Sequence, residues 1–300
     1  MTHKFPWRWL TVLIGLSLIG GQLPGARSQG ELDKFAYLPL IASSQTIGSS
    51  LRFHGNGQND LDRVKIPIDP PVPADLGATD LTLEFWLKAT DAENASGYAT
   101  CDANDGWITA HIIFDRDVYF AGDYGDYGVA LAAGKIVFGV NNGSTGTTLC
   151  GQTNVADGVW HHIALTRRLT GPVRLYIDGQ LDASANTSVT GDISYRDNRA
   201  TAYPNSDPFL VIGAEKHDAG SSYPSFSGWI DEVRLSTEVR YTGNFSRPIG
   251  PFVPDGSTAA LYHLDEGSGD VIHDALTTSP GTRRYGGQPA GPEWSIESPF

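Results

Sequence analysis

Apolar and polar residues alternate with a period of two along most of the chain after residue 50. In LTLEFWLK (residues 81–88), side chains at odd positions would face one way and those at even positions the other. This pattern is typical of a β-strand with one buried face. Similar short segments follow, separated by Gly, Asn, Asp and Pro: YGVALAAGKIVFGV, VWHHIALTR, DPFLVIGAEK and GWIDEVRLS. No window keeps a 3.6-residue period, so the sequence predicts an antiparallel β-sandwich or barrel with little helix.

The segment VRLYIDGQLDAS (residues 173–184) predicts a β-hairpin. Val173, Leu175 and Ile177 alternate with more polar residues, and Asp178-Gly179 follows directly. An Asp-Gly pair supplies the two positive φ angles that a two-residue type I′ turn requires. A second pair of strands is expected to join at residues 133–135 (Ala-Gly-Lys).

Residues 1–28 have the pattern of a secretory signal peptide. Lys4 and Arg8 precede an apolar stretch, residues 10–21, and residues 26–28 (Ala-Arg-Ser) provide small residues around a cleavage site. A membrane anchor is the alternative, but the stretch is shorter than the ~20 residues that span a bilayer. We therefore expect a secreted or surface-displayed protein, with a linker at residues 29–48 and no membrane insertion after cleavage. An edge strand within residues 29–48 is the alternative to a linker.

The charge of the chain restricts its partners. The formal net charge is −13, and residues 1–28 contain basic residues but no acidic ones, so the remainder is more acidic still. Such a field repels phosphate backbones and anionic lipids, which makes nucleic acid an improbable partner. A divalent cation, a glycan or an extracellular protein fits better, and the oligomeric state stays open.

Two cysteines, Cys101 and Cys150, occur in the chain. An even pair in an exported protein favours one disulfide, because the extracellular space is oxidising. Two free thiols are the alternative. A zinc site is disfavoured, because two cysteines without a nearby histidine make a poor ligand set.

Six segments in order resemble the laminin-G-like family of concanavalin A-like jelly rolls: LRFHGNG, LTLEFWLK, DGVWHHIALTR, VRLYIDGQLD, FLVIGAEK and FSGWIDEVRLS. The resemblance covers roughly residues 50–300 and implies two antiparallel sheets. It also implies an extracellular module for adhesion, glycan binding or protein contact, although the wider superfamily includes glucanases. The resemblance thus makes residues 49–300 one jelly-roll domain.

One segment departs from the family order. ALYHLDEGSGDVIHDA (residues 260–275) resembles a piece that opens the domain in many members, but here it follows all the others. Too few residues remain beyond it for a second domain. We therefore expect residues 256–300 to be a permuted segment that closes the same sandwich, with residues 260–263 beside residues 51–53. A loose tail is the alternative.

Catalysis is not expected. The glucanases of this superfamily carry E-x-D-x-x-E on one strand, where one carboxylate attacks and its partner protonates the leaving group. No segment shows that spacing, and there is no G-x-S-x-G elbow. His161 and His162 cannot chelate one ion, because successive strand residues point to opposite faces.

Calcium is the metal that the sequence favours. In GWIDEVRLS the apolar period breaks between Ile230 and Val233, which predicts a β-bulge that re-aims Asp231. The resemblance implies a structural Ca²⁺ at Asp231, with carbonyl ligands near Gly55 and Asp265. An Asx turn or surface charge at Asp231 remains the alternative.

A second acidic segment is FDRDVYFAGDYGDYG (residues 114–128), which contains Asp115, Asp117, Asp123 and Asp126. It lacks the EF-hand spacing, so a solvated loop is the favoured interpretation, with a metal site as the alternative.

Aromatic residues in two loop regions are the candidate ligand contacts. Flat rings stack on sugars, and loops on a rigid scaffold often carry function. The candidates are Trp107, Tyr119, Tyr124, Tyr127, Tyr195, Tyr203 and Tyr223. Three hypotheses follow: a non-catalytic module that binds carbohydrate or a glycosylated surface with one structural calcium, a protein–protein adhesion or scaffold domain, and a diverged glycoside hydrolase.

Overall fold

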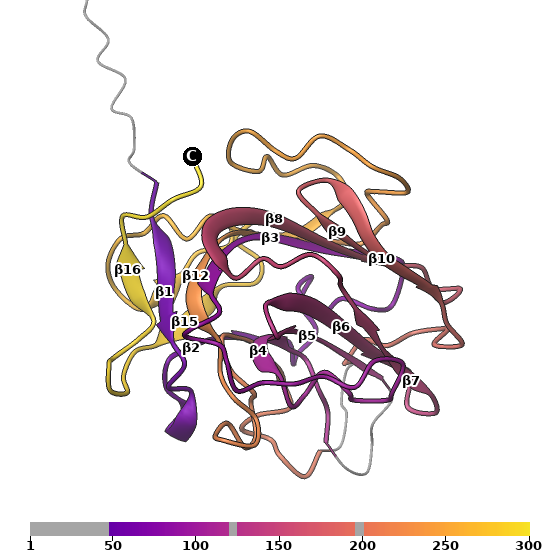
Figure 1. Cartoon of the computed structure of the whole chain (residues 1–300), viewed down its shortest axis with the longest axis horizontal. Helices are drawn as coiled ribbons and strands as arrows, with labels where there is room; N and C mark the ends of the chain where they lie inside the picture. The colour runs from indigo at the N-terminus through magenta and orange to yellow at the C-terminus, as the bar shows by residue number, and fades with distance from the viewer. Residues whose placement is uncertain (1–47, 120–124, 196–200) are drawn as a thin grey trace, which may run out of the picture. The chain divides into compact units, whose positions relative to one another are not determined.

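The computed structural model describes residues 48–119, 125–195 and 201–300 as two antiparallel sheets packed face to face (Figure 1). The one helix among the described residues is the 3₁₀ turn Gln58–Asp60, and none is long and apolar enough to cross a membrane. The all-β sandwich prediction is confirmed. The predicted signal peptide, the predicted linker up to residue 47, and Tyr124 lie outside the described residues.

The first sheet contains eight strands. Their order is β10 (Gln180–Asn186), β9 (Pro172–Ile177), β8 (Asp157–Arg167), β3 (Leu81–Thr90), β12 (Ser227–Ser236), β1 (Ser50–His54) and β16 (Glu293–Ser295), with β13 (Thr258–Tyr262) also paired to β12.

The second sheet also contains eight strands. Their order is β14 (Val271–Ile272), β15 (Gly281–Arg284), β2 (Arg63–Pro67), β11 (Phe209–Ile212), β4 (His111–Asp115), β5 (Asp126–Ala132), β6 (Lys135–Asn141) and β7 (Gly146–Cys150). In Figure 1, β8, β9 and β10 lie over β5, β6 and β7.

The core fills the space between the sheets, as the alternation predicts. Leu81, Leu83, Phe85 and Leu87 of β3 are completely buried in it. Trp86 points to the outer face of the first sheet, where it packs with Phe252 and Leu261. The even positions of this strand are therefore covered on the outer face as well, so every residue of β3 up to position 87 is buried.

The predicted hairpin turns are confirmed. Asp178 and Gly179 adopt φ of 50° and 79° between β9 and β10, and Ala133 and Gly134 adopt 47° and 75° between β5 and β6. These are the left-handed conformations of a type I′ turn, whose twist matches that of the paired strands.

The C-terminal segment closes the sandwich, but the strand partner predicted for residues 260–263 was wrong. The strand β13 pairs with the end of β12, where Tyr262 lies opposite Val233. β1 occupies the other half of the same edge, where Leu51 lies opposite Ile230. The free edge of β1 is taken by β16, with Trp294 opposite Leu51 (Figure 1, yellow beside indigo). Because β14 and β15 join the second sheet beside β2, the segment completes both layers.

A buried carboxylate holds the chain segment after β12 to the outer face of the first sheet. Glu84 accepts hydrogen bonds from Arg234 Nε at 2.8 Å and Tyr241 Oη at 2.7 Å. His162 Nε2 lies 3.2 Å from the same carboxylate, whereas His161 Nδ1 bonds Asp178 at 2.7 Å. The two histidines therefore have separate partners, as the strand alternation predicts.

The outer face of the second sheet is covered by the segment around Trp107. Gly128 of β5 and Gly139 of β6 lie opposite each other, and the Trp107 indole rests on both. A Cβ atom at Gly139 would lie 1.8 Å from the ring, and one at Gly128 would lie 2.0 Å from it. The two glycines thus create the space that this fully buried ring fills.

A disulfide attaches this segment to the sheet. The predicted Cys101–Cys150 bond is confirmed, and Cys150 is the last residue of the edge strand β7. The loop that carries Trp107 is therefore covalently bound to the strand beside the one on which its indole rests.

We expect Gly139→Ala to lower the free energy of unfolding by about 1–3 kcal/mol, because an added methyl group collides with the Trp107 ring. Gly250→Ala is the matched control, since a Cβ atom there meets nothing within 4 Å. Denaturant unfolding followed by tryptophan fluorescence measures both. Equal stabilities of the two variants would contradict the packing described.

We expect the double variant Cys101→Ser/Cys150→Ser to lose about 3–4 kcal/mol of stability, because the bond closes a loop with a sequence separation of 49 residues. The native protein should show no alkylatable thiol before reduction and two after it, by intact mass. Two thiols alkylated without reduction would rule out the bond in the purified protein.

Candidate functional site

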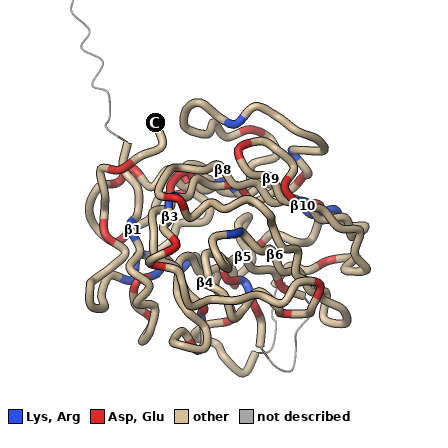
Figure 2. The backbone as a smooth tube through the Cα atoms, viewed as in Figure 1, with Lys and Arg blue, Asp and Glu red and all other residues tan. Residues whose placement is uncertain are grey.

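Acidic residues outnumber basic ones along the chain, and they lie in strands and loops alike (Figure 2). Three of them converge on the outer face of the second sheet. Carboxylate oxygens of Asp105, Asp117 and Asp126 all lie within 4.8 Å of one another. We call these three residues the acidic cluster.

Strand alternation places Asp126 in this cluster. Asp126 begins β5 and faces outward, two residues before Gly128. Asn141 lies opposite Asp126 on β6 and donates a hydrogen bond to Asn104 Oδ1 at 3.0 Å. The pair Asp126 and Asn141 therefore forms a polar position beside the two glycines that accommodate Trp107. The disulfide-bound loop brings Asp105 to this position.

The chain after β4 supplies Asp117. The Asp117 backbone N–H donates to Asp115 Oδ1 at 2.7 Å, and the other Asp115 oxygen accepts from the Lys216 backbone N–H at 2.8 Å. Asp115 thus joins the end of β4 to the chain after β11. This geometry holds the Asp117 carboxylate beside those of Asp105 and Asp126.

A second charged group borders the cluster. The imidazole of His217 bonds Asp207 at 2.6 Å through Nε2 and Glu215 at 3.0 Å through Nδ1. Although burial lowers the pKa of His217, these hydrogen bonds raise it to about 10, so the ring is protonated at neutral pH. Buried Lys216 donates to the Asp207 and Phe209 carbonyls.

The acidic cluster has the donor chemistry of a calcium site. Burial, followed by the nearby charge of Asp115, raises the pKa of Asp117 to about 7. A divalent cation would relieve this repulsion, and three carboxylates are the hard oxygen ligands that Ca²⁺ takes. Asp117, Glu215 and His217 also lie within 4.8 Å of one another, but both nitrogens of His217 face carboxylates. The cluster of three aspartates is the better fit.

A cavity of about 400 Å³ opens over the cluster. Its lining is almost entirely polar and aromatic: Asn104, Asp105, Ile108, Asp117, Val118, Tyr119, Asp126, Asn141, Glu215, His217, Asp218 and Tyr223. At its rim Tyr119 is 54% exposed and Tyr203 is 40% exposed. The two ring centroids are 5.6 Å apart, and those of Tyr203 and His217 are 5.3 Å apart.

The structure brings together part of the predicted ligand set. Tyr119 and Tyr223 line this cavity, and Tyr203 contacts Tyr119. The other described candidates are buried in apolar packing and do not face a ligand: Trp107, Tyr127 and Tyr195. Trp107 is buried because two glycines accommodate it, and Tyr127 because its odd position on β5 faces the core.

The predicted β-bulge in β12 is confirmed. The pairing with β3 shifts register between Asp231 and Arg234, and Glu232 adopts φ of 49°. Asp231 is buried, and burial followed by the charges of Glu232 and Asp265 raises its pKa to about 9. Asp265 Oδ1 accepts the Ser49 backbone N–H at 2.7 Å, and Ser298 Oγ donates to Asp231 Oδ2 at 3.3 Å.

Gly55 does not join this pair. The register of β1 against β12 sets Leu51 opposite Ile230 and His54 opposite Ser227. Gly55 therefore lies beyond the far end of β1, about five residues or ~17 Å along the strand from the level of Asp231. The structure brings Asp231 near Asp265 but separates both from Gly55.

The acidic segment that the sequence assigns to a solvated loop is partly buried. Asp115, Asp117 and Asp126 are buried: Asp115 supports the acidic cluster, and the other two belong to it and line its cavity. Asp105, Glu215 and His217 were not predicted as site residues. Two local signals could have pointed to this region: Asp126 stands at an outward position of its strand, and Glu215-Lys216-His217 begins three residues after the end of the buried strand β11.

A family model described as the concanavalin A-like lectin/glucanases superfamily, of the laminin G type, matches residues 61–241. Among curated proteins, the sushi, von Willebrand factor type A, EGF and pentraxin domain-containing protein 1 of Mus musculus is 30% identical over 161 residues. The Rattus norvegicus protein is 29% identical over 160. The matched part is 52% of this chain and 4% of each relative.

Solved structures of similar fold include a putative carbohydrate binding protein from Bacteroides ovatus. It is 18% identical, with a TM-score of 0.49, over 78% of this chain and 57% of that one. A heptameric SAP-like pentraxin from Limulus polyphemus is 13% identical, with a TM-score of 0.42, over 79% and 96% of the two chains. Domains LG4-5 of the mouse laminin alpha1 chain are 12% identical, with a TM-score of 0.42, over 75% and 48%.

The family match spans more than half of the chain and includes the strands that carry the acidic cluster. The protein therefore belongs to the concanavalin A-like lectin/glucanases superfamily, as a member of the laminin G type.

Proposed function

We propose that the protein is a calcium-dependent, non-catalytic recognition module for carbohydrate or for a glycosylated surface. One observation carries this proposal: the acidic cluster lies in an open cavity whose rim holds exposed tyrosine rings.

Calcium supplies the electrophilic part of the proposed site. Ca²⁺ takes six to eight oxygen ligands, and the acidic cluster offers three carboxylates. Asn104 and Asn141 line the same cavity and carry further oxygen donors. An ion held from one side by aspartates keeps coordination positions for hydroxyl groups of a ligand.

The tyrosines supply the apolar part. Tyr119 and Tyr203 are the exposed rings beside the cavity, and each presents a flat face and a polar tip. Such rings bury the C–H face of a sugar while short polar side chains satisfy its hydroxyls. The proposed ligand is therefore a polyhydroxylated ring rather than an extended apolar chain.

A structural calcium at Asp231 and Asp265 is a separate proposal. The carboxylate of Asp231 is buried and its pKa is raised, so a cation beside it and Asp265 would be favourable, and Ser49 and Ser298 add oxygen atoms nearby. An extracellular location is proposed as well: it agrees with the signal-peptide pattern of residues 1–28 and with the disulfide.

One observation favours glycoside hydrolysis as a second candidate function. Asp117 has a raised pKa, whereas that of Glu215 is lowered because hydrogen bonds to His217 outweigh its burial. Carboxyl groups with pKa values pushed apart can act as acid and base. Release of nitrophenol from aryl glycosides, abolished by Glu215→Gln, would establish this function. Binding without turnover would support the module.

A glycan array probed with the mature protein, with calcium and with a chelator, tests the proposed function. We expect the protein to bind some of the glycan spots in the presence of calcium and to lose this binding in the presence of a chelator. Binding to extracellular proteins with no glycan spot above background would replace the proposal with protein adhesion.

We expect calcium to raise thermal stability by RT ln(1 + [L]/Kd), ~2.7 kcal/mol at a hundredfold excess over Kd. Asp117→Asn and Asp126→Asn should remove the increase that comes from the acidic cluster, and Asp231→Asn the increase from the second proposed ion. Differential scanning calorimetry of the three variants, with and without chelator, separates the two sites. A melting temperature that calcium leaves unchanged would eliminate both.

We expect Tyr119→Ala and Tyr203→Ala each to weaken binding of an array-positive glycan several-fold, because a ring contact contributes on the order of 1 kcal/mol. Tyr285→Ala is the matched control, since Tyr285 is equally exposed but belongs to the C-terminal segment beside β15. Isothermal titration measures all three. A loss in the control as large as in the rim variants would locate the site elsewhere.

A further inference from the structure

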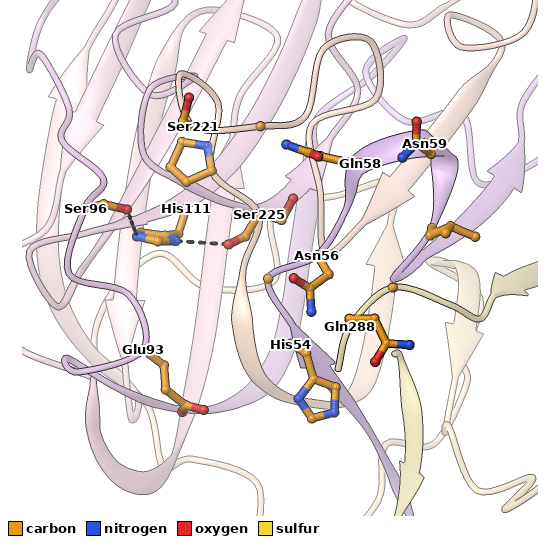
Figure 3. Close-up of a pocket in the computed structure, with 15 residues that line it drawn as sticks. His54, Asn56, Gln58, Asn59, Glu93, Ser96, His111, Ser221, Ser225 and Gln288 are labelled. Atoms are coloured by element: carbon orange, nitrogen blue, oxygen red, sulfur yellow. Dashed lines mark hydrogen bonds between the residues drawn. The ribbon is translucent and has the colours of Figure 1, made fainter. Parts of the chain in front are cut away.

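A second cavity, of about 490 Å³, shares the chain segment 215–225 with the cavity of the acidic cluster, and Figure 3 shows the residues that line it. Residues 220, 221, 224 and 225 of that segment line it, whereas residues 215, 217, 218 and 223 line the cavity of the cluster. Three other parts of the chain complete its wall: residues 54–61, residues 93–111, and the C-terminal residues 287 and 288.

The floor of this cavity is a neutral, fixed histidine. His111 Nδ1 lies 3.0 Å from the Ser225 carbonyl, which only accepts, so Nδ1 carries the proton. His111 Nε2 accepts the Gly97 backbone N–H at 3.1 Å. Burial lowers the pKa of His111, which agrees with the neutral ring that these two bonds require. Figure 3 shows the ring held from both sides.

The C-terminal segment holds the opposite wall in place. Gly287 has φ of 94°, and a Cβ atom there would lie 2.8 Å from the Asn56 Cβ. Asn56 Nδ2 in turn donates to the Pro289 carbonyl at 2.8 Å. The wall is therefore assembled before a ligand arrives, as in most small-molecule sites.

Several polar groups around the cavity are available to a ligand. Within the described chain, the side chains of Gln58, Asn59, Ser221 and Gln288 make no hydrogen bond to protein, although all four line the cavity. Carboxamides and hydroxyls each offer donors and acceptors together. Hydroxyl groups of a ligand have the same dual character, so they can satisfy these side chains in either direction.

The charges around the cavity exclude other ligand classes. Among the described residues that line it there is no lysine or arginine, so an anion would find no permanently charged cation there. Glu93 is the one carboxylate in the same set, and it forms an ion pair with Arg52 and accepts a hydrogen bond from Thr90 Oγ1 at 2.9 Å, so little of its charge is available to a bound cation. Leu61 and Pro224 are the main apolar side chains, too few for an apolar ligand. A neutral polyhydroxylated compound remains.

We propose that this cavity is a second ligand site, which binds a neutral saccharide of one or two rings without calcium. Its volume lies within the ~300–1,000 Å³ range of small-molecule sites. The site does not depend on the acidic cluster, so it holds whether or not the function proposed above is correct.

The test is a titration of the ¹⁵N-labelled mature protein in chelator, followed by amide chemical shifts. The probes are glucose, galactose, N-acetylglucosamine and their β-linked disaccharides, with inorganic phosphate as the anionic comparison. We expect saturable shifts with at least one sugar in residues 54–61, 220–225 and 287–288, and none with phosphate. No saturable shift with any sugar, or stronger shifts with phosphate, would overturn the proposal.

Variants locate the binding. Ser221→Trp fills the cavity from its rim and should abolish the sugar shifts, whereas Ser222→Trp adds the same ring at the next exposed position and should retain them. Gln58→Ala and Gln288→Ala should each raise the Kd several-fold. Equal loss in Ser222→Trp would refute a binding site in this cavity.

Discussion

The edge of β12 is the constraint on which this fold depends. One side of β12 is paired with β3 on both sides of the bulge, and the other is shared by β1 near the beginning of the described chain and β13 near its end. An unpaired strand edge exposes backbone groups that seek partners. Joining two short strands end to end along β12 satisfies them, and β16 then covers β1. The C-terminal segment is thereby drawn around both sheets, which places Asp265 near Asp231 and Gly287 against Asn56.

Packing on the outer face of the second sheet gives the acidic cluster its position. Two facing glycines admit the Trp107 indole, and the disulfide binds the same loop to β7. The loop then has little freedom, and Asp105 is held opposite Asp126. Apolar packing and a covalent bond thus hold the three carboxylates close together, and burial followed by the charge of Asp115 raises the pKa of Asp117. Such stored repulsion is what a divalent cation would relieve.

The chain segment 215–225 contributes residues to two cavities of different chemistry. In one, Glu215 and His217 belong to a dense network of charges, and in the other Ser221 and Ser225 face a neutral histidine and carboxamides. The two proposed sites, one charged and calcium-dependent and one neutral, thus share a single supporting segment.

The sequence by itself determined the features that depend on neighbours along the chain. Alternation in LTLEFWLK predicted a strand with one face in the core, Asp178-Gly179 predicted a tight hairpin, and the broken period after Ile230 predicted a bulge. What only the tertiary structure decided was which strands share an edge and which loops meet. Residues 260–263 carry the same local pattern whether they pair with β1 or with β12, so their partner was predicted wrongly. Aromatic composition likewise could not separate Trp107, which two distant glycines accommodate, from Tyr119, which stays at a rim. Local periodicity sets the face to which a side chain points, but the contacts of that face come from segments far away in the chain.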